Sequence, residues 1–65
     1  MNNDNMLTAK HQSTYLAERL LIAYYASNDT SRAWHVAQAH EALKQAAAAM
    51  GYTLEPIALD DEQAA

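Results

Sequence analysis

The sequence has 65 residues and a mass of 7.2 kDa, with four Lys or Arg, eight Asp or Glu and no Cys. This length fits one domain at most, and the lack of cysteine excludes disulfide bonds and zinc–thiolate sites. The formal net charge of −4 argues against a strong electrostatic attraction to nucleic acid or to anionic lipid.

Alanine dominates the apolar composition. Hydrophobic residues make up 51% of the chain, but 15 of them are alanine and only 10 are Leu, Ile or Val. Alanine has the highest helix propensity, so the chain is expected to form helices readily. It has few large side chains for a core, and a chain of this size buries only about 60% of its unfolded surface when it folds alone. Composition therefore predicts a helical protein that is completed by self-association or by a partner.

The first predicted element is a helix over residues 6–27. It follows a polar lead-in, residues 1–5, in which Asp4 or Asn5 is expected to cap the helix. The helix is expected to stop before residues 28–31, because this Asn-Asp-Thr-Ser run consists of cap-forming and turn-forming residues.

A second helix is predicted over residues 31–50. Gly51 is placed to adopt the left-handed conformation after it, with Tyr52 folding back on the last turn. Both helices are about 30 Å long, and two helices of equal length joined by a short turn pack as an antiparallel hairpin. The fold class we expect is all-α, completed as a four-helix bundle by dimerisation.

The pattern changes after the second helix. Pro56 blocks a helix through residues 52–59, so we expect this segment to be extended. Residues 60–65 are acidic and small, and we expect a frayed end there. The apolar side chains of the extended segment form a candidate docking tail for a partner: Tyr52, Leu54, Ile57 and Leu59.

Two stripes with spacings of three and four residues are expected to form the contact between the helices. Seams that mix small residues with Leu and Met let two helices pack at a crossing angle of about 20°. The predicted stripes are Met6, Ala9, Ser13, Leu16, Leu20, Ala23 and Ser27 in the first helix, and Val36, Ala39, Leu43, Ala46 and Met50 in the second.

The first helix has apolar residues left over on the side away from its stripe. An uncovered apolar stripe usually marks an interface. Burial of the face around Leu21, Ile22 and Tyr25 against a second copy predicts a homodimer, and a larger protein is the other expected occupant. The residues predicted for a partner or oligomer interface are Leu7, Tyr15, Leu21, Ile22, Tyr25 and Trp34.

Trp34 has two interpretations, because it lies on a strip of the second helix that is otherwise polar. In one, the ring folds over the turn and packs on Tyr24 or on the tail. In the other, it anchors a partner, since Trp, Tyr and Arg dominate the energetics of protein interfaces.

The sequence offers no pattern that predicts a metal site or catalysis. His35 and His40 are five residues apart, about 140° around a helix, and cannot share a face. His40 and Glu41 begin like a zinc-protease helix motif, but Lys44 stands where the second histidine is required. Two helices cannot enclose a substrate cleft of typical volume. We therefore expect no enzymatic activity, cofactor, metal or small-molecule substrate.

The function expected from these features is that of a small non-catalytic protein–protein interaction module: an adaptor, a chaperone-like partner or an inhibitor of a larger protein. The absence of an apolar run of about 18 residues and of an export leader predicts no membrane span and a cytoplasmic location. The alternative is a dimeric RNA- or DNA-binding regulator. In architecture alone, the predicted hairpin resembles the plasmid copy-number RNA-binding four-helix bundle, an acidic dimer of helical hairpins. Nucleic acid is the less favoured partner, because the basic residues are spread around the helices: Lys10, Arg19, Arg32 and Lys44.

Overall fold

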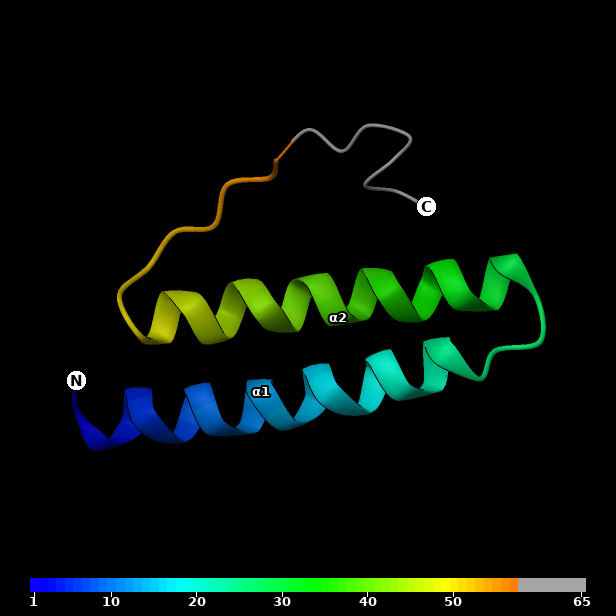
Figure 1. Cartoon of the computed structure of the whole chain (residues 1–65). Coiled ribbons are helices and arrows are strands. Elements are labelled where there is room, and N and C mark those ends of the chain that lie inside the picture. Colours follow the sequence, from blue (N-terminus) through cyan, green and yellow to red (C-terminus); the bar gives the residue numbers. More distant parts are fainter. Residues whose placement is uncertain (58–65) are drawn as a thin grey trace.

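The computed structural model describes residues 1–57. It contains two α-helices, α1 (Asn3–Tyr24) and α2 (Asp29–Ala49), which run antiparallel and side by side (Figure 1). No strand occurs in the described part of the chain. The prediction of an all-α protein with two helices packed against each other is confirmed.

Asparagine side chains start both helices. The Asn2 side chain accepts a hydrogen bond of 2.7 Å from the Asn5 amide, and the Asn28 side chain accepts one of 2.7 Å from the Ser31 amide. Each bond satisfies one of the amides that the start of a helix leaves unpaired. Both helices therefore begin as soon as an asparagine can cap them.

The helix bounds consequently differ from the predicted ones. The first helix begins and ends three residues earlier than the predicted range 6–27, and its cap is Asn2 rather than Asp4 or Asn5. The second begins two residues earlier and ends one residue earlier than the predicted range 31–50. Most of the polar lead-in thus belongs to α1, where the negative charge of Asp4 in the first turn is favourable to the helix dipole.

Arg32 holds the end of α1 and the turn together. Its Nε donates to the Ala23 carbonyl at 3.3 Å, its Nη2 donates to the Ala26 carbonyl at 3.0 Å, and its Nη1 lies 2.9 Å from the Asp29 carboxylate. The last carbonyls of a helix lack partners within the helix, and a cation is favoured beside them. The last turn of α1 has no basic residue of its own, so a side chain from α2 supplies this charge.

Gly51 ends α2 in the predicted way. Its φ is +93°, in the left-handed region that favours glycine. The Tyr52 amide donates to the Ala47 carbonyl at 2.8 Å, and the Gly51 amide donates to the Ala48 carbonyl at 3.1 Å. These two bonds form a Schellman motif, which reverses the chain direction after the helix.

Alanine forms the contact between the two helices. Ala39 is fully buried, and no side chain larger than alanine is buried in the described part of the chain. Small side chains let helix axes approach closely, since the separation depends on the side chains at the contact. The buried residues are Ala9 and Ala23 of α1 and Ala39, Ala42 and Ala46 of α2.

The predicted seam is wrong in its large residues. The alanines of the predicted stripes lie at the contact, with Leu16 and Val36 half-buried beside them. Each helix is turned so that its alanines face the other helix, because they allow a closer approach than Leu or Met. The large seam residues are instead 40–51% exposed: Met6, Leu20, Leu43 and Met50.

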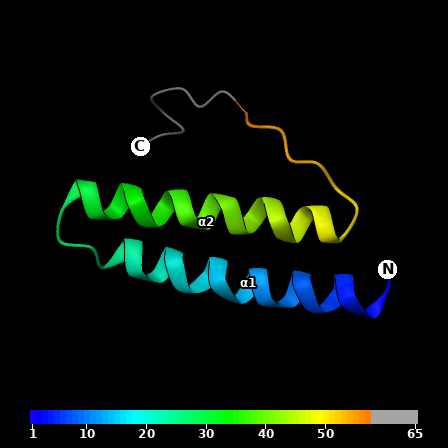
Figure 2. The ribbon, with the colours of Figure 1, turned by 180° about the vertical axis from the view of Figure 1, so that it is seen from behind.

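The helices form a single layer, and the smallest dimension of the molecule is 13 Å. Residues 52–57 run back along the side of α2 that faces away from α1, as two opposite views show (Figures 1 and 2). They contain no helix or strand and are exposed. The remainder of the predicted tail, residues 58 and 59, and the acidic residues 60–65 lie outside the described residues.

Candidate interaction surface

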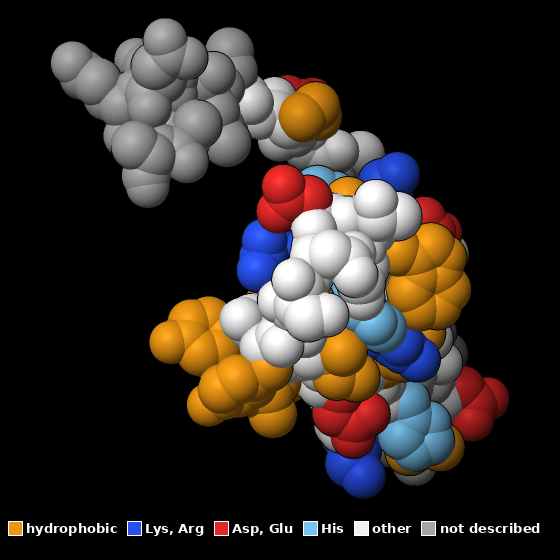
Figure 3. All heavy atoms as spheres, turned by 90° about the vertical axis from the view of Figure 1, so that its right-hand side faces the viewer, with side chains coloured by type: hydrophobic (Ala, Val, Ile, Leu, Met, Phe, Trp, Pro, Cys, Tyr) orange, Lys and Arg blue, Asp and Glu red, His pale blue; other side chains and the backbone are white. Residues whose placement is uncertain are grey.

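The end of α1 carries an apolar run, Leu20-Leu21-Ile22-Ala23-Tyr24-Tyr25. Ala23 faces α2 and is buried, but the five larger side chains of the run are 44–75% exposed. Figure 3 shows hydrophobic side chains projecting on opposite sides of the hairpin, which is seen there from the turn. Exposed apolar side chains are common singly, whereas a contiguous group of this kind marks an interaction site.

Part of this run faces directly away from α2. Leu21, Ile22 and Tyr25, together with Leu7, lie on the outer arc of α1, opposite the buried Ala9 and Ala23. We call these four residues the outer α1 surface. All four were predicted as interface residues, and all are exposed. The ring of Tyr25 also packs edge-on against Tyr24, with a centroid distance of 4.8 Å.

The two other predicted interface residues, Tyr15 and Trp34, lie elsewhere, in a cluster around Arg19. The Arg19 guanidinium carbon is 4.8 Å from the Tyr15 ring centroid and 5.5 Å from that of Trp34. Its Nη1 is 3.1 Å from His35 Nδ1. Since arginine only donates, His35 Nδ1 is the acceptor in this bond. We call Tyr15, Arg19, Trp34 and His35 the arginine cluster.

Trp34 therefore follows neither interpretation in full. Its ring contacts Arg19 and packs edge-on against His35 at a centroid distance of 5.0 Å. It remains 55% exposed, so one part of the ring joins α2 to α1 and the other part is accessible.

A second apolar surface lies on one broad side of the hairpin. Met6 and Leu20 each precede a buried alanine of α1 by three residues, and Val36 and Leu43 each precede a buried alanine of α2 by three. A residue three positions before a buried alanine points about 60° away from the other helix, in the same rotational sense in both helices. In an antiparallel pair, these four side chains therefore lie on the same broad side of the hairpin. With Met50, seven residues after Leu43, these residues form what we call the heptad face: Met6, Leu20, Val36, Leu43 and Met50.

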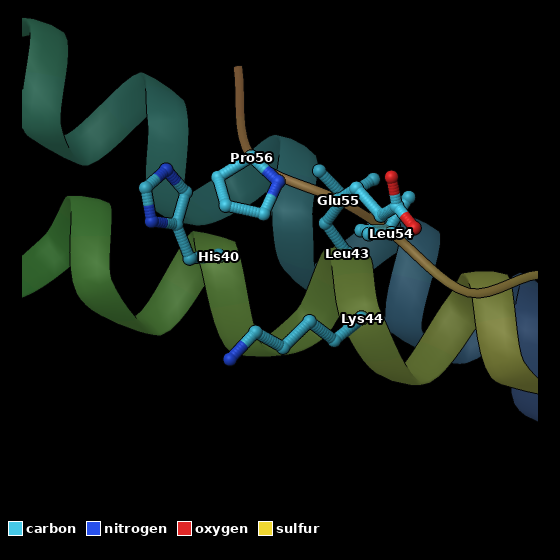
Figure 4. Close-up of a pocket in the computed structure, with 6 residues that line it drawn as sticks. All are labelled: His40, Leu43, Lys44, Leu54, Glu55 and Pro56. Atoms are coloured by element: carbon cyan, nitrogen blue, oxygen red, sulfur yellow. The ribbon is translucent and has the colours of Figure 1, made fainter. Parts of the chain in front are cut away.

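The tail borders this face. A shallow cleft between α2 and the tail is lined by residues from both, with the Pro56 ring beside His40 and Leu54 above Leu43 (Figure 4). The Lys44 and Glu55 side chains point in opposite directions. Of the predicted docking residues, Tyr52, Leu54 and Ile57 are exposed, and Leu59 lies outside the described residues.

Two features of these surfaces escaped the sequence analysis. The heptad face was assigned to the contact inside the hairpin, although a stripe of alanines at the same spacing was available for that contact. The arginine cluster had a partial signal, because Tyr15 and Arg19 are four residues apart and face each other on a helix. The other two members, Trp34 and His35, lie on α2, and their position beside Arg19 could be predicted only if the register between the two helices were known.

No group of three metal-ligating side chains is present in residues 1–57. Within the same residues, neither helix has the length and apolar character needed to cross a membrane. Comparisons of the chain with protein-family models, with curated proteins and with solved structures found no match.

Proposed function

We propose that this chain is a small non-catalytic protein–protein interaction module that binds a larger protein through the outer α1 surface. The observation that carries the proposal is the exposure of its four large apolar side chains, which are 44–75% exposed. Each large side chain covered by a partner contributes roughly 1.5–3 kcal/mol of transfer free energy before ordering costs. One of the four, Tyr25, is a tyrosine, a residue type enriched at interface hot spots. An adaptor, a chaperone-like partner and an inhibitor all use a surface of this kind.

We further propose that the hairpin is completed by self-association as a homodimeric four-helix bundle. Stable domains consist of at least two packed layers around a core. This hairpin is one layer, 13 Å in its smallest dimension, with only alanine buried. A second hairpin supplies the missing layer.

The nucleic-acid alternative has less support. Arg32 is engaged with Asp29 and two carbonyls of the turn, and Arg19 lies between Tyr15 and Trp34. Phosphate contacts would compete with these interactions, and the net charge of −4 opposes them.

The test is a comparative pull-down from the native host, after nuclease treatment, with the wild-type chain and two variants. Leu21→Asp places a charge on the outer α1 surface. Ala37→Asp places the same charge at an exposed position of α2 and is the matched control. We expect one host protein to be retained by the wild type and by Ala37→Asp, at low and at high salt. Leu21→Asp should lose it, because an interface that buries an unpaired carboxylate is strongly disfavoured.

Equal retention by all three chains would contradict the assignment of the outer α1 surface. Retention that disappears with nuclease treatment or falls steeply with salt would instead favour the nucleic-acid alternative. Circular dichroism of both variants establishes that a loss of binding is not a loss of helix.

A further inference from the structure

We infer that the heptad face is the surface on which a second copy of this chain docks. In this arrangement, α1 of each copy lies against α2 of the other. The inference deepens the proposed self-association and leaves the outer α1 surface free for a different partner. It assigns the large seam residues Met6, Leu20, Leu43 and Met50 to the contact between two chains.

The two broad sides of the hairpin differ in charge. Helix geometry places Glu41 and Gln45 on the side opposite the heptad face, which also carries the arginine cluster. The Gln45 amide donates there to the Glu41 carboxylate at 3.2 Å. No charged residue lies between the large apolar side chains of the heptad face; Lys10 and Lys44 lie at its lateral margins and Arg32 at its turn end. A continuous apolar side and a side with charged and polar groups are what one layer of a two-layer bundle presents to its core and to water.

The heptad face also has the repeat of a helical bundle. Met6, Ser13 and Leu20 are seven residues apart in α1, as are Val36, Leu43 and Met50 in α2. A seven-residue repeat keeps the same face of a helix toward a neighbouring helix along its whole length. A single partner helix laid in the groove between the two stripes would leave the outer edge of each stripe exposed, whereas another hairpin covers the whole face.

The register of the hairpin divides the face into three layers. The hydrogen bond between Arg19 and His35 places these two residues near the same level. Because the helices run in opposite directions and each residue rises about 1.5 Å, the next residues, Leu20 and Val36, are offset by about 3 Å along the axis. The same small offset relates Ser13 to Leu43 and Met6 to Met50, so each of these pairs belongs to one layer. The central layer therefore combines a small side chain on α1 with a large one on α2.

This small–large pair fits a second copy of the same hairpin. A twofold axis parallel to the helices places α1 of one copy opposite α2 of the other, antiparallel, without changing the level of any residue. Leu43 of each copy then lies over Ser13 of the other. Alternation of large and small residues across facing positions is how packed helical layers interdigitate.

The area of the face is sufficient for a stable dimer. Two helices, each about 30 Å long and about 10 Å wide, present roughly 600 Å² in projection. Two copies then cover about 1,200 Å², which exceeds the roughly 1,000 Å² expected of a biological interface. The chain also exposes 5342 Å² in total, whereas a compact monomer of this mass exposes about 4,100 Å²; the exposed residues 52–57 contribute to this excess.

The first test is disulfide cross-linking between different single-cysteine chains, which is possible because the sequence has no cysteine. Ser13→Cys chains are mixed with Leu43→Cys chains and oxidised. A single-cysteine chain cannot cross-link within itself, so every covalent product joins two copies. We expect the mixed dimer to be the main covalent product. A mixture of Ser13→Cys with Ala37→Cys, exposed outside the face, is the matched control and should give only background.

A mixed dimer no more abundant than this control would overturn the inference. A predominance of Ser13→Cys homodimers would overturn the proposed pairing, because it requires α1 of one copy to lie against α1 of the other. Neither variant introduces a charge, and circular dichroism of each chain before mixing establishes that the helices are retained.

The second test measures molar mass by sedimentation equilibrium over a wide range of concentration. We expect the wild type to have twice the chain mass of 7.2 kDa. Leu20→Glu should be monomeric at concentrations where Ala37→Glu is dimeric. A helical wild type that stays monomeric throughout would contradict the inference.

The same measurement separates this inference from the proposed binding of a larger protein. Leu21→Asp should lose host-protein capture and keep the dimer mass. A dimeric wild type that captures no host protein would support the dimer contact at the heptad face and refute the proposed binding of a larger protein. A monomeric wild type that captures a host protein would refute the dimer contact and support the binding.

Discussion

Arg19 connects the two helices through two contacts with α2 and is held in place by a third within α1. Its planar guanidinium lies near the Tyr15 and Trp34 rings, and one of its nitrogens donates to His35. A guanidinium combines aromatic stacking with directed hydrogen bonds, which an ammonium cannot do in the same way. The residue therefore ties α1 to α2 beside a seam whose buried side chains are all alanine.

Replacement of Arg19 by methionine should weaken the hairpin, because methionine keeps the aliphatic stem and loses the charge and the donors. We expect the free energy of unfolding to fall by about 1 kcal/mol. The emission of Trp34, the only tryptophan, should shift as its neighbour changes. Lys10→Met is the control and should change neither the stability nor the emission by a comparable amount. A variant with wild-type stability and emission would show that the arginine cluster contributes nothing.

At the scale of the element, the helices meet through methyl groups. Ala39 is fully buried and has Ala42 and Ala46 beside it along the contact side of α2. Each buried methyl contributes only about 0.8 kcal/mol of transfer free energy. The seam thus provides proximity between the helices more than hydrophobic stabilisation.

Replacement of Ala39 by leucine should separate the helices, because the contact has no room for three more carbon atoms. Overpacking of this kind typically costs about 1–3 kcal/mol. Thermal unfolding followed by circular dichroism measures the loss. Ala37→Leu adds the same atoms at an exposed position of α2 and should leave the midpoint nearly unchanged. Equal midpoints for the two variants would refute the alanine seam.

Local chemistry explains which elements could be predicted from the sequence. The break near Asn28 and the positive φ of Gly51 follow from the residue types themselves, so the two helices and their turn were predictable. The choice of contact stripe was not. The alanine stripe and the Leu–Met stripe have the same spacing and differ by about 60° of helix rotation. Which of them faces the other helix depends on the balance between close approach and burial over the whole assembly, and no local signal encodes that balance.

At the scale of the whole molecule, most of the large apolar side chains lie outside the hairpin. The outer α1 surface and the heptad face together hold more apolar side-chain volume than the seam between the helices. The sequence predicted the outer α1 surface, because its residues lie outside whichever stripe of α1 is chosen as the contact with α2. It did not predict the second, because that surface exists only when the seam is built from alanine.

Stability should therefore depend on protein concentration. For a dimer that dissociates on unfolding, mass action links the midpoint temperature to concentration. With the average unfolding enthalpy per residue, we expect the midpoint to rise by about 5 °C for each tenfold increase in concentration. Calorimetry at three concentrations measures this rise. A midpoint independent of concentration would mean that the hairpin unfolds as a monomer.

The alanine seam has a consequence for how this sequence can vary. Glycine is the only smaller residue, and it lowers helix stability by about 1 kcal/mol relative to alanine. Any larger residue pushes the helices apart. The buried seam positions are therefore restricted to alanine, because both smaller and larger residues lower the stability. The positions of the outer α1 surface, which contact neither the other helix nor the proposed second copy, are under no such constraint. A lineage of such chains could therefore exchange one binding partner for another while the spacing between its two helices stayed the same.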